Sequence, residues 1–160
     1  MLLGETLSIA EEQFAISGFS SNGRHQVDIT NFKAFSESFA NSKARLSEIH
    51  GKHSTRLGAA IRHSEQSLAQ QMQRKKLLLV ITDGAPSDID VYDQHYLEHD
   101  SWHAIHALNK SGIKSFCLNL DTGANQVIEH IFGRGRYETL EQLDRLPEVL
   151  SRIYLRYARH

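Results

Sequence analysis

The chain has 160 residues and a formal net charge of −1, with 18 lysines and arginines against 19 aspartates and glutamates. This length suits one domain that buries about two-thirds of its unfolded surface, and the near-neutral charge gives no basic footprint for nucleic acid. A single cysteine, Cys117, excludes an internal disulfide and favours a reducing, cytoplasmic setting. No apolar run reaches the roughly 18 residues of a membrane-spanning helix, so we expect no membrane partner. The near-neutral charge likewise leads us to expect no nucleic-acid partner.

The N-terminal part of the chain predicts a helix and then a hairpin. Residues 2–12 suit a short helix, and residues 14–19 suit a strand that ends in the turn cluster Ser-Ser-Asn-Gly. Residues 27–32 alternate between apolar and polar, which is typical of a half-exposed edge strand paired with its predecessor. Polar residues follow, with one helix expected around 36–49.

The rest of the chain predicts alternating helices and strands. Ser54 is suited to cap a helix over residues 55–71, and the apolar run 77–82 is typical of a central parallel strand covered on both faces. The further elements expected are helix 99–110, strand 113–120, helix 123–132, strand 137–140 and a last helix from Pro147. This alternation predicts an open, mostly parallel α/β sheet, in which ligands bind beyond the carboxyl ends of the strands.

Oxygen-bearing side chains follow several predicted strands, namely Ser20, Asp83 and Asp121. Asp83 is the most informative, because the apolar run ends abruptly in Thr-Asp-Gly. Thr55 opens the predicted helix, and the two side chains together suggest half of a site for a hard cation. Asp88 and Asp90, further along the loop after Asp83, are expected to cap or solvate that loop.

Three segments resemble the C-terminal von Willebrand factor A (vWA) domain of the NorD/CbbO family: residues 55–63 (TRLGAAIRH), 78–90 (LLVITDGAPSDID) and 131–135 (IFGRG). They occur in the order found in the family, and the resemblance covers essentially all of residues 1–160, which we take as one vWA-like domain. It implies a Rossmann-like fold with a mostly parallel sheet, one antiparallel edge strand and helices on both faces. It also implies a non-enzymatic adaptor of a MoxR-type AAA+ ATPase (NorQ or CbbQ), which activates a target such as nitric oxide reductase or Rubisco.

The hallmark of the vWA family is a metal-ion-dependent adhesion site, which binds an acidic residue of a partner through Mg²⁺. It combines Asp-x-Ser-x-Ser after the first strand with a threonine and an aspartate from two other loops. Thr55 matches the threonine and Asp83 matches the aspartate, so the resemblance assigns these two residues as metal ligands. Magnesium prefers six oxygen ligands in near-octahedral geometry at about 2.0–2.1 Å.

The chain departs from the family because it contains no Asp-x-Ser-x-Ser. Its first residues resemble the helix that follows this motif, so the first, central strand would lie upstream of Met1. With Thr55 and Asp83 alone, we expect Mg²⁺ binding to be weak or absent. Either the domain is truncated, or its sheet is completed differently. Strands 14–19 and 77–82 could close directly on each other, or two chains could form a homodimer by exchanging strands or helices.

Two other interpretations stay open. Four histidines recur at helical spacing, compatible with zinc but also ordinary for an exposed helix face: His95, His99, His103 and His106. The alternative function is a phosphate- or nucleotide-binding α/β enzyme that uses Asp83, although Gly-x-Gly-x-x-Gly and the P-loop motif are both absent. A metal-dependent phosphatase would need further acids beside Asp83, for which Asp121 alone is thin support.

Overall fold

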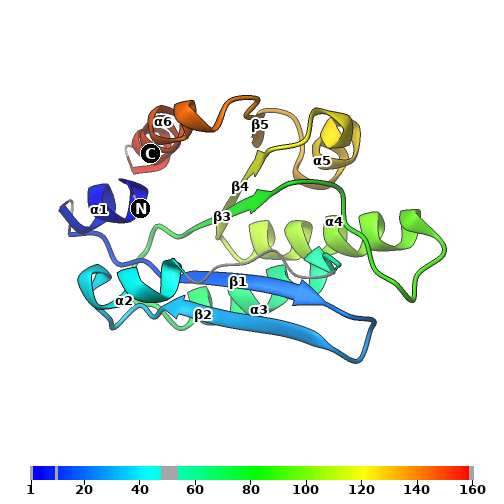
Figure 1. Ribbon diagram of the computed structural model, residues 1–160, viewed down its shortest axis with the longest axis horizontal. Helices are drawn as coiled ribbons and strands as arrows, with labels where there is room; N and C mark the ends of the chain where they lie inside the picture. Colours follow the sequence, from blue (N-terminus) through cyan, green and yellow to red (C-terminus); the bar gives the residue numbers. More distant parts are fainter. Residues whose placement is uncertain (1, 10, 48–53, 159–160) are drawn as a thin grey trace.

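The computed structural model describes residues 2–9, 11–47 and 54–158, and its strands form two separate sheets (Figure 1). The first sheet is an antiparallel hairpin and the second is a parallel sheet in the order β3-β4-β5. The strands are β1 (Ile16–Ser21), β2 (Val27–Lys33), β3 (Leu77–Thr82), β4 (Lys114–Asn119) and β5 (Tyr137–Thr139).

The hairpin forms where the alternating pattern predicts it. Ser21 pairs with Val27, and the backbone N–H of Asn22 donates to Gln26 O across the turn at 2.9 Å. Gly23 takes a φ of 82°, a left-handed conformation that glycine adopts without steric cost. The prediction of an edge strand paired with its predecessor is therefore confirmed, although β1 begins and ends two residues later than expected.

Helices cover both faces of the parallel sheet. On one face lie α3 (Leu57–Ala69), α4 (Gln94–Lys110) and α5 (Asn125–Phe132), and on the other lies α6 (Leu146–Ala158). The helices α1 (Leu2–Ile9) and α2 (Phe39–Leu46) lie near the end at which β1 and β3 begin (Figure 1). A mostly parallel α/β architecture with one antiparallel edge strand is therefore confirmed. Among the described helices, none is both long and apolar enough to cross a membrane.

Strand β4 divides the core into two clusters because its side chains alternate between the faces. Cys117 packs with α3, α4 and α5, whereas Phe116 and Leu118 pack with α6 residues such as Leu150. Burial raises the pKa of the Cys117 thiol to about 12, so this cysteine is protonated and unreactive at neutral pH.

The side chains of β3 pack on both faces of the sheet, as predicted, but the prediction that β3 is a central strand is wrong for the described structure. This strand pairs with β4 alone, and β1 pairs with β2 alone, so the two do not close directly on each other. Ile81 is 46% exposed, whereas its partner in β4, Leu118, is fully buried. The sequence of β3 is that of a buried parallel strand, but here the strand lies at an edge.

Two helix starts also differ from the sequence-based expectation. Ser54 does not cap α3, because its backbone pairs with Ser21, and the helix begins after Arg56 without a side-chain cap. Helix α4 begins at Gln94, five residues early, because the Asp93 carboxylate accepts a hydrogen bond from the His95 N–H and caps it. The predicted helix at 36–49 contains α2, and positions 48 and 49 lie outside the described residues.

Leu118 in β4 is buried and Ile81 in β3 is partly exposed, so truncating these two side chains should lower the free energy of unfolding by different amounts. Leu118→Ala should lower the free energy of unfolding by about 2–5 kcal/mol, because it leaves a cavity in a closed core. Ile81→Ala should cost about 1 kcal/mol or less, since nearly half of the side chain is already in water. Urea unfolding of both variants measures the difference, and equal costs would contradict the unequal burial of the two side chains.

Candidate functional site at the carboxyl edge

Thr55 lies in a short extended segment that joins the two sheets. Ser54 exchanges two backbone hydrogen bonds with Ser21 at the end of β1, with N···O distances of 2.8 and 3.0 Å. Thr55 exchanges two with Ser87 in the loop after β3, at 2.8 and 3.1 Å. This pairing holds the carboxyl ends of β1 and β3 at one edge of the molecule.

Arg56, the next residue, makes two ion pairs that fasten this junction. Its Nε donates to Asp88 Oδ2 at 2.8 Å, and its Nη2 donates to Asp90 Oδ1 at 2.5 Å. The Arg56 side chain is 12% exposed and that of Asp88 is 0% exposed, so the first pair is shielded from solvent. Removing one partner from such a pair leaves the other charge unpaired in a poorly solvated place.

The same two carboxylates also hold the turn of the β1–β2 hairpin. Asp88 Oδ1 accepts hydrogen bonds from the N–H groups of Gly23 and Ile89, at 2.8 and 2.7 Å. Asp90 Oδ2 accepts from the Arg24 N–H at 2.7 Å. We expected these aspartates to cap or solvate their own loop; Asp88 does bond to Ile89 within it, and the two aspartates also connect three segments that are distant in the sequence.

The charges of this network are stabilised by direct hydrogen bonds. Burial alone would raise the pKa of Asp88, but donors from Gly23, Arg56, Ile89 and Ser21 outweigh it and lower the pKa below its usual value of 3.8. The pKa of Asp90 is also lowered, chiefly by the backbone N–H of Arg24. Both groups are therefore ionised at neutral pH.

The two predicted metal ligands lie at this edge without a completed ligand set. Asp83 directly follows β3 and is exposed, and Thr55 pairs with the backbone of Ser87 in the same loop. Asp88 is fully occupied by its donors. Within residues 2–9, 11–47 and 54–158, no group of three or more His, Cys, Asp or Glu side chains could hold a metal ion. Two protein oxygens are fewer than the six ligands that Mg²⁺ prefers, and weak or absent Mg²⁺ binding stays a prediction.

The carboxyl end of β4 is closed by a separate network. The buried Asn119 donates from Nδ2 to the backbone oxygen of Asp121 and to Asn125 Oδ1, at 2.5 and 2.9 Å. The Asp121 carboxylate accepts from the Gly123 N–H at 2.9 Å and caps the short helix Thr122–Ala124. Asp121 therefore has a local structural role and does not extend an acidic cluster around Asp83.

The histidine-rich face of α4 makes ring and ion-pair contacts. The ring of His106 stacks on Trp102 with 5.0 Å between centroids, and His99 meets His130 edge-on at 5.8 Å. His130 Nε2 lies 3.9 Å from a Glu98 carboxylate oxygen. These side chains do not assemble into a metal-holding group among the described residues, so the structure does not support the zinc interpretation.

Sequence reasoning missed three exposed apolar side chains on the segment that follows Asp83 in the chain. Three large side chains on the β3–α4 loop and the first turns of α4 lie open to solvent: Ile89 at 67%, Tyr92 at 102% and Tyr96 at 58%. Tyrosine is enriched at protein interfaces, and exposed apolar clusters often mark binding sites. We call these three residues the loop patch. No pattern in the sequence indicates that they are exposed.

Neutralising Asp88 should weaken the junction. In Asp88→Asn, the amide oxygen can still accept from Gly23 and Ile89, but Arg56 loses its buried counter-charge. We expect a loss of about 1–3 kcal/mol in urea unfolding. The matched control, Asp83→Asn, changes an exposed aspartate on the same loop and should stay within about 0.5 kcal/mol. Equal losses in the two variants would contradict the role given to Asp88.

The advantage of wild type over Asp88→Asn should depend on pH. Because the folded-state pKa of Asp88 lies below the unfolded value, its contribution is present in full above about pH 4 and declines as the pH falls through the folded-state pKa. Unfolding of both proteins between pH 7 and about pH 2 measures the gap. A gap that stays constant over that range would contradict the lowered pKa.

Comparison with known proteins identifies the family. The model of the von Willebrand factor type A domain matches residues 5–150. The chain is 34% identical to proteins named NorD from Stutzerimonas stutzeri and Brucella melitensis, over 143 and 155 residues, which are 89% and 96% of this chain. An uncharacterized protein of Pseudomonas aeruginosa is also 34% identical, over 99% of this chain.

These relatives are much longer proteins, since the matched regions are 23%, 24% and 26% of their lengths, so the chain spans about a quarter of each. Two solved structures share the fold. They are proximal thread matrix protein 1 of the mussel byssus (TM-score 0.68, 16% identity, 94% of this chain and 39% of that one) and BatB of Bacteroides thetaiotaomicron (0.66, 16%, 99% and 86%). With the family model spanning most of the chain, the protein belongs to the von Willebrand factor type A domain family.

Proposed function

We propose that this domain is a non-enzymatic adaptor that works with a MoxR-type AAA+ ATPase to activate a target enzyme of the nitric oxide reductase or Rubisco type. The vWA family and the similarity to proteins named NorD support this proposal. Because such an ATPase needs a supply of ATP, the proposal places the domain in the cytoplasm.

The observation that carries the proposal is the loop patch at the carboxyl edge. Ile89, Tyr92 and Tyr96 are exposed, while Asp88 and Asp90 anchor the same loop through Arg56. A loop that is already ordered loses less conformational entropy when it binds. Exposed aromatic side chains on a fixed support are a suitable centre for a protein interface.

Thr55 and Asp83 belong to the proposed surface as oxygen-bearing groups, because Asp83 opens the loop after β3 and Thr55 pairs with Ser87 of that loop. The resemblance implies that they recognise an acidic residue of a partner through Mg²⁺, and two protein oxygens are few for an ion that prefers six ligands. The proposal therefore relies mainly on direct protein contacts, and it predicts that the purified chain alone shows weak or no binding of Mg²⁺ in isothermal titration calorimetry.

An enzyme that uses Asp83 has less support. Asp121, the other acid considered for such chemistry, is engaged as a helix cap. The described residues also bring no cluster of acids, histidines or cysteines together at this edge. Turnover of a generic phosphate ester by the purified chain would overturn the adaptor proposal.

The loop patch gives the direct test of binding to the ATPase. Tyr92→Ala should weaken binding of a MoxR-type ATPase of the NorQ or CbbQ type by about tenfold or more, as expected for an interface hot spot. Biolayer interferometry with the ATPase held on the sensor and ATP present measures the affinity.

Met72→Ala is the matched control for this experiment. Met72 is 97% exposed but lies before β3, at the amino end of that strand and away from the loop patch. Its truncation should leave the affinity unchanged. Equal effects of the two substitutions, or no effect of Tyr92→Ala, would overturn the proposed surface.

A further inference from the structure

A surface hollow of about 310 Å³ lies between the carboxyl-terminal halves of α4 and α5 and the turn that follows α5. The two helices pack in the same core cluster, and the buried Ile131 and Phe132 of that cluster form an apolar floor. The loop patch lies at the other end of α4, on its first turn and the loop before it. The hollow is therefore a separate surface feature, which the proposed function does not use.

Part of the lining is flat and aromatic. Trp102 and His106 lie one turn apart on α4, and their rings stack with 5.0 Å between centroids and 9° between planes. Trp102 is half-buried and His106 is exposed. The indole ring therefore offers an apolar surface against which an aliphatic side chain can pack.

Another part of the lining is cationic. Arg136 is exposed, and among the described residues it has no acidic partner within ion-pair distance. Arg134 donates from Nε to Glu129 Oε1 at 2.8 Å, which leaves its Nη1 and Nη2 groups for another acceptor. No aspartate or glutamate of the described residues lines this hollow, so Arg136 gives it an unbalanced positive charge.

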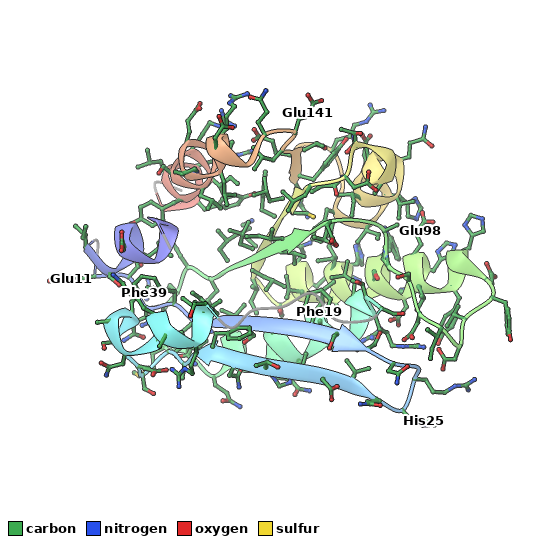
Figure 2. All side chains as sticks on the ribbon, viewed as in Figure 1. Glu11, Phe19, His25, Phe39, Glu98 and Glu141 are labelled. Carbon is green, nitrogen blue, oxygen red and sulfur yellow. The ribbon has the colours of Figure 1, made fainter. Side chains whose placement is uncertain are left out.

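Two glutamates beside the hollow are already engaged. Glu129 accepts from Arg134 and, at 2.9 Å, from the Tyr137 hydroxyl, and the hydrogen bond from Arg134 chiefly lowers the pKa of the Glu129 carboxyl. Glu129 is therefore ionised at neutral pH and offsets the charge of Arg134 alone. Glu98, on the side of α4 that faces α5 (Figure 2), lies 3.9 Å from His130 Nε2.

The turn that carries the two arginines is held by hydrogen bonds. Arg136 N–H donates to Gly133 O at 3.2 Å, and the N–H of Cys117 in β4 donates to Arg136 O at 2.9 Å. The Arg156 side chain of α6 donates to Gly135 O at 3.2 Å. Because this backbone is already ordered, binding a ligand there costs less conformational entropy.

These features favour a ligand that joins a carboxylate to an apolar group. A planar guanidinium binds a carboxylate through two parallel hydrogen bonds, and the aromatic surface beside it accepts an aliphatic chain. Phosphate groups, in contrast, are well held by backbone N–H groups at a helix amino terminus. Here both helices present their carboxyl-terminal halves, whose dipoles oppose added negative charge, so a singly charged carboxylate is better suited than a phosphate.

We propose that this hollow, which we call the arginine hollow, binds an acidic segment of a partner protein. A glutamate or aspartate carboxylate of the partner bonds to Arg136, with Arg134 as a second donor, and a neighbouring apolar side chain packs against Trp102 and the apolar floor. The arginine hollow is separate from the loop patch and from the carboxyl edge, so it does not rest on the proposed adaptor function.

The intrinsic fluorescence of the chain tests this site directly, because Trp102 is its single tryptophan. The probe is the blocked tripeptide acetyl-Glu-Leu-Glu-amide, which has no fluorescent side chain. We expect a saturable change in the Trp102 emission with a dissociation constant on the order of 1 mM, and weaker binding when salt is added. The matched peptide acetyl-Gln-Leu-Gln-amide has nearly the same shape without the charge and should give no saturable change.

Two arginine variants make the test specific. Arg136→Gln removes the unbalanced guanidinium from an exposed position, so we expect the chain to stay folded and its affinity for the acidic peptide to fall about tenfold. Arg145→Gln is the matched control, because Arg145 is also exposed but directly precedes α6, which lies on the other face of the sheet. This substitution removes the same charge and should leave the affinity unchanged.

Three results would overturn the proposal. The first is no saturable change up to about 10 mM of the acidic peptide. The second is an equal effect of Arg136→Gln and Arg145→Gln, or equal binding of the two peptides, because the response would then not depend on this guanidinium or on the carboxylates. The third is tighter binding of inorganic phosphate than of the acidic peptide, which would assign the arginine hollow to a phosphate ligand.

Discussion

The backbone pairing of Ser54 and Thr55 on both of their sides determines how the two sheets meet. The backbone of Ser54 is hydrogen-bonded to the end of β1, and the backbone of Thr55 is hydrogen-bonded to the loop after β3. These two residues therefore connect the two sheets at the carboxyl edge. The backbone hydrogen bonds to Ser21 and Ser87 involve only these two residues of the connecting segment. The shielded ion pairs of Arg56 reinforce this junction, because they join the following residue to the same loop and, through Asp88, to the hairpin turn.

Burying charged groups costs desolvation free energy. The Arg56–Asp88 pair therefore fixes the arrangement of the junction more than it raises the net free energy of unfolding. Asp88 has donors at both of its oxygens, and these donors come from the hairpin turn, the junction and its own loop. The result is a loop that is fixed at its middle while Ile89, Tyr92 and Tyr96 extend into solvent. An ordered support beneath exposed aromatic side chains is consistent with a domain that acts by binding another protein.

Local patterns in the sequence predict the elements of this fold but not the environment of each element. The alternation in β2 and the apolar run of β3 are both correct as strands, because these signals come from neighbouring side chains. The position of β3 at an edge depends on the whole sheet, whereas the apolar composition of this strand predicts a central position. Likewise, Asp83 and Thr55 follow from the family's motifs, whereas Arg56 with Asp88 is a contact between residues 32 positions apart that no spacing rule reveals.

Residue-resolved amide exchange of the chain alone tests the central claim, which is that the described parts of the two sheets are joined at the carboxyl edge and open elsewhere between β1 and β3. The account predicts slow exchange at Ser21, Ser54, Thr55 and Ser87, whose N–H groups are bonded across the junction, and fast exchange at Leu79 and Ile81, whose N–H groups point away from β4. Slow exchange at all six positions in a monomeric sample would contradict it.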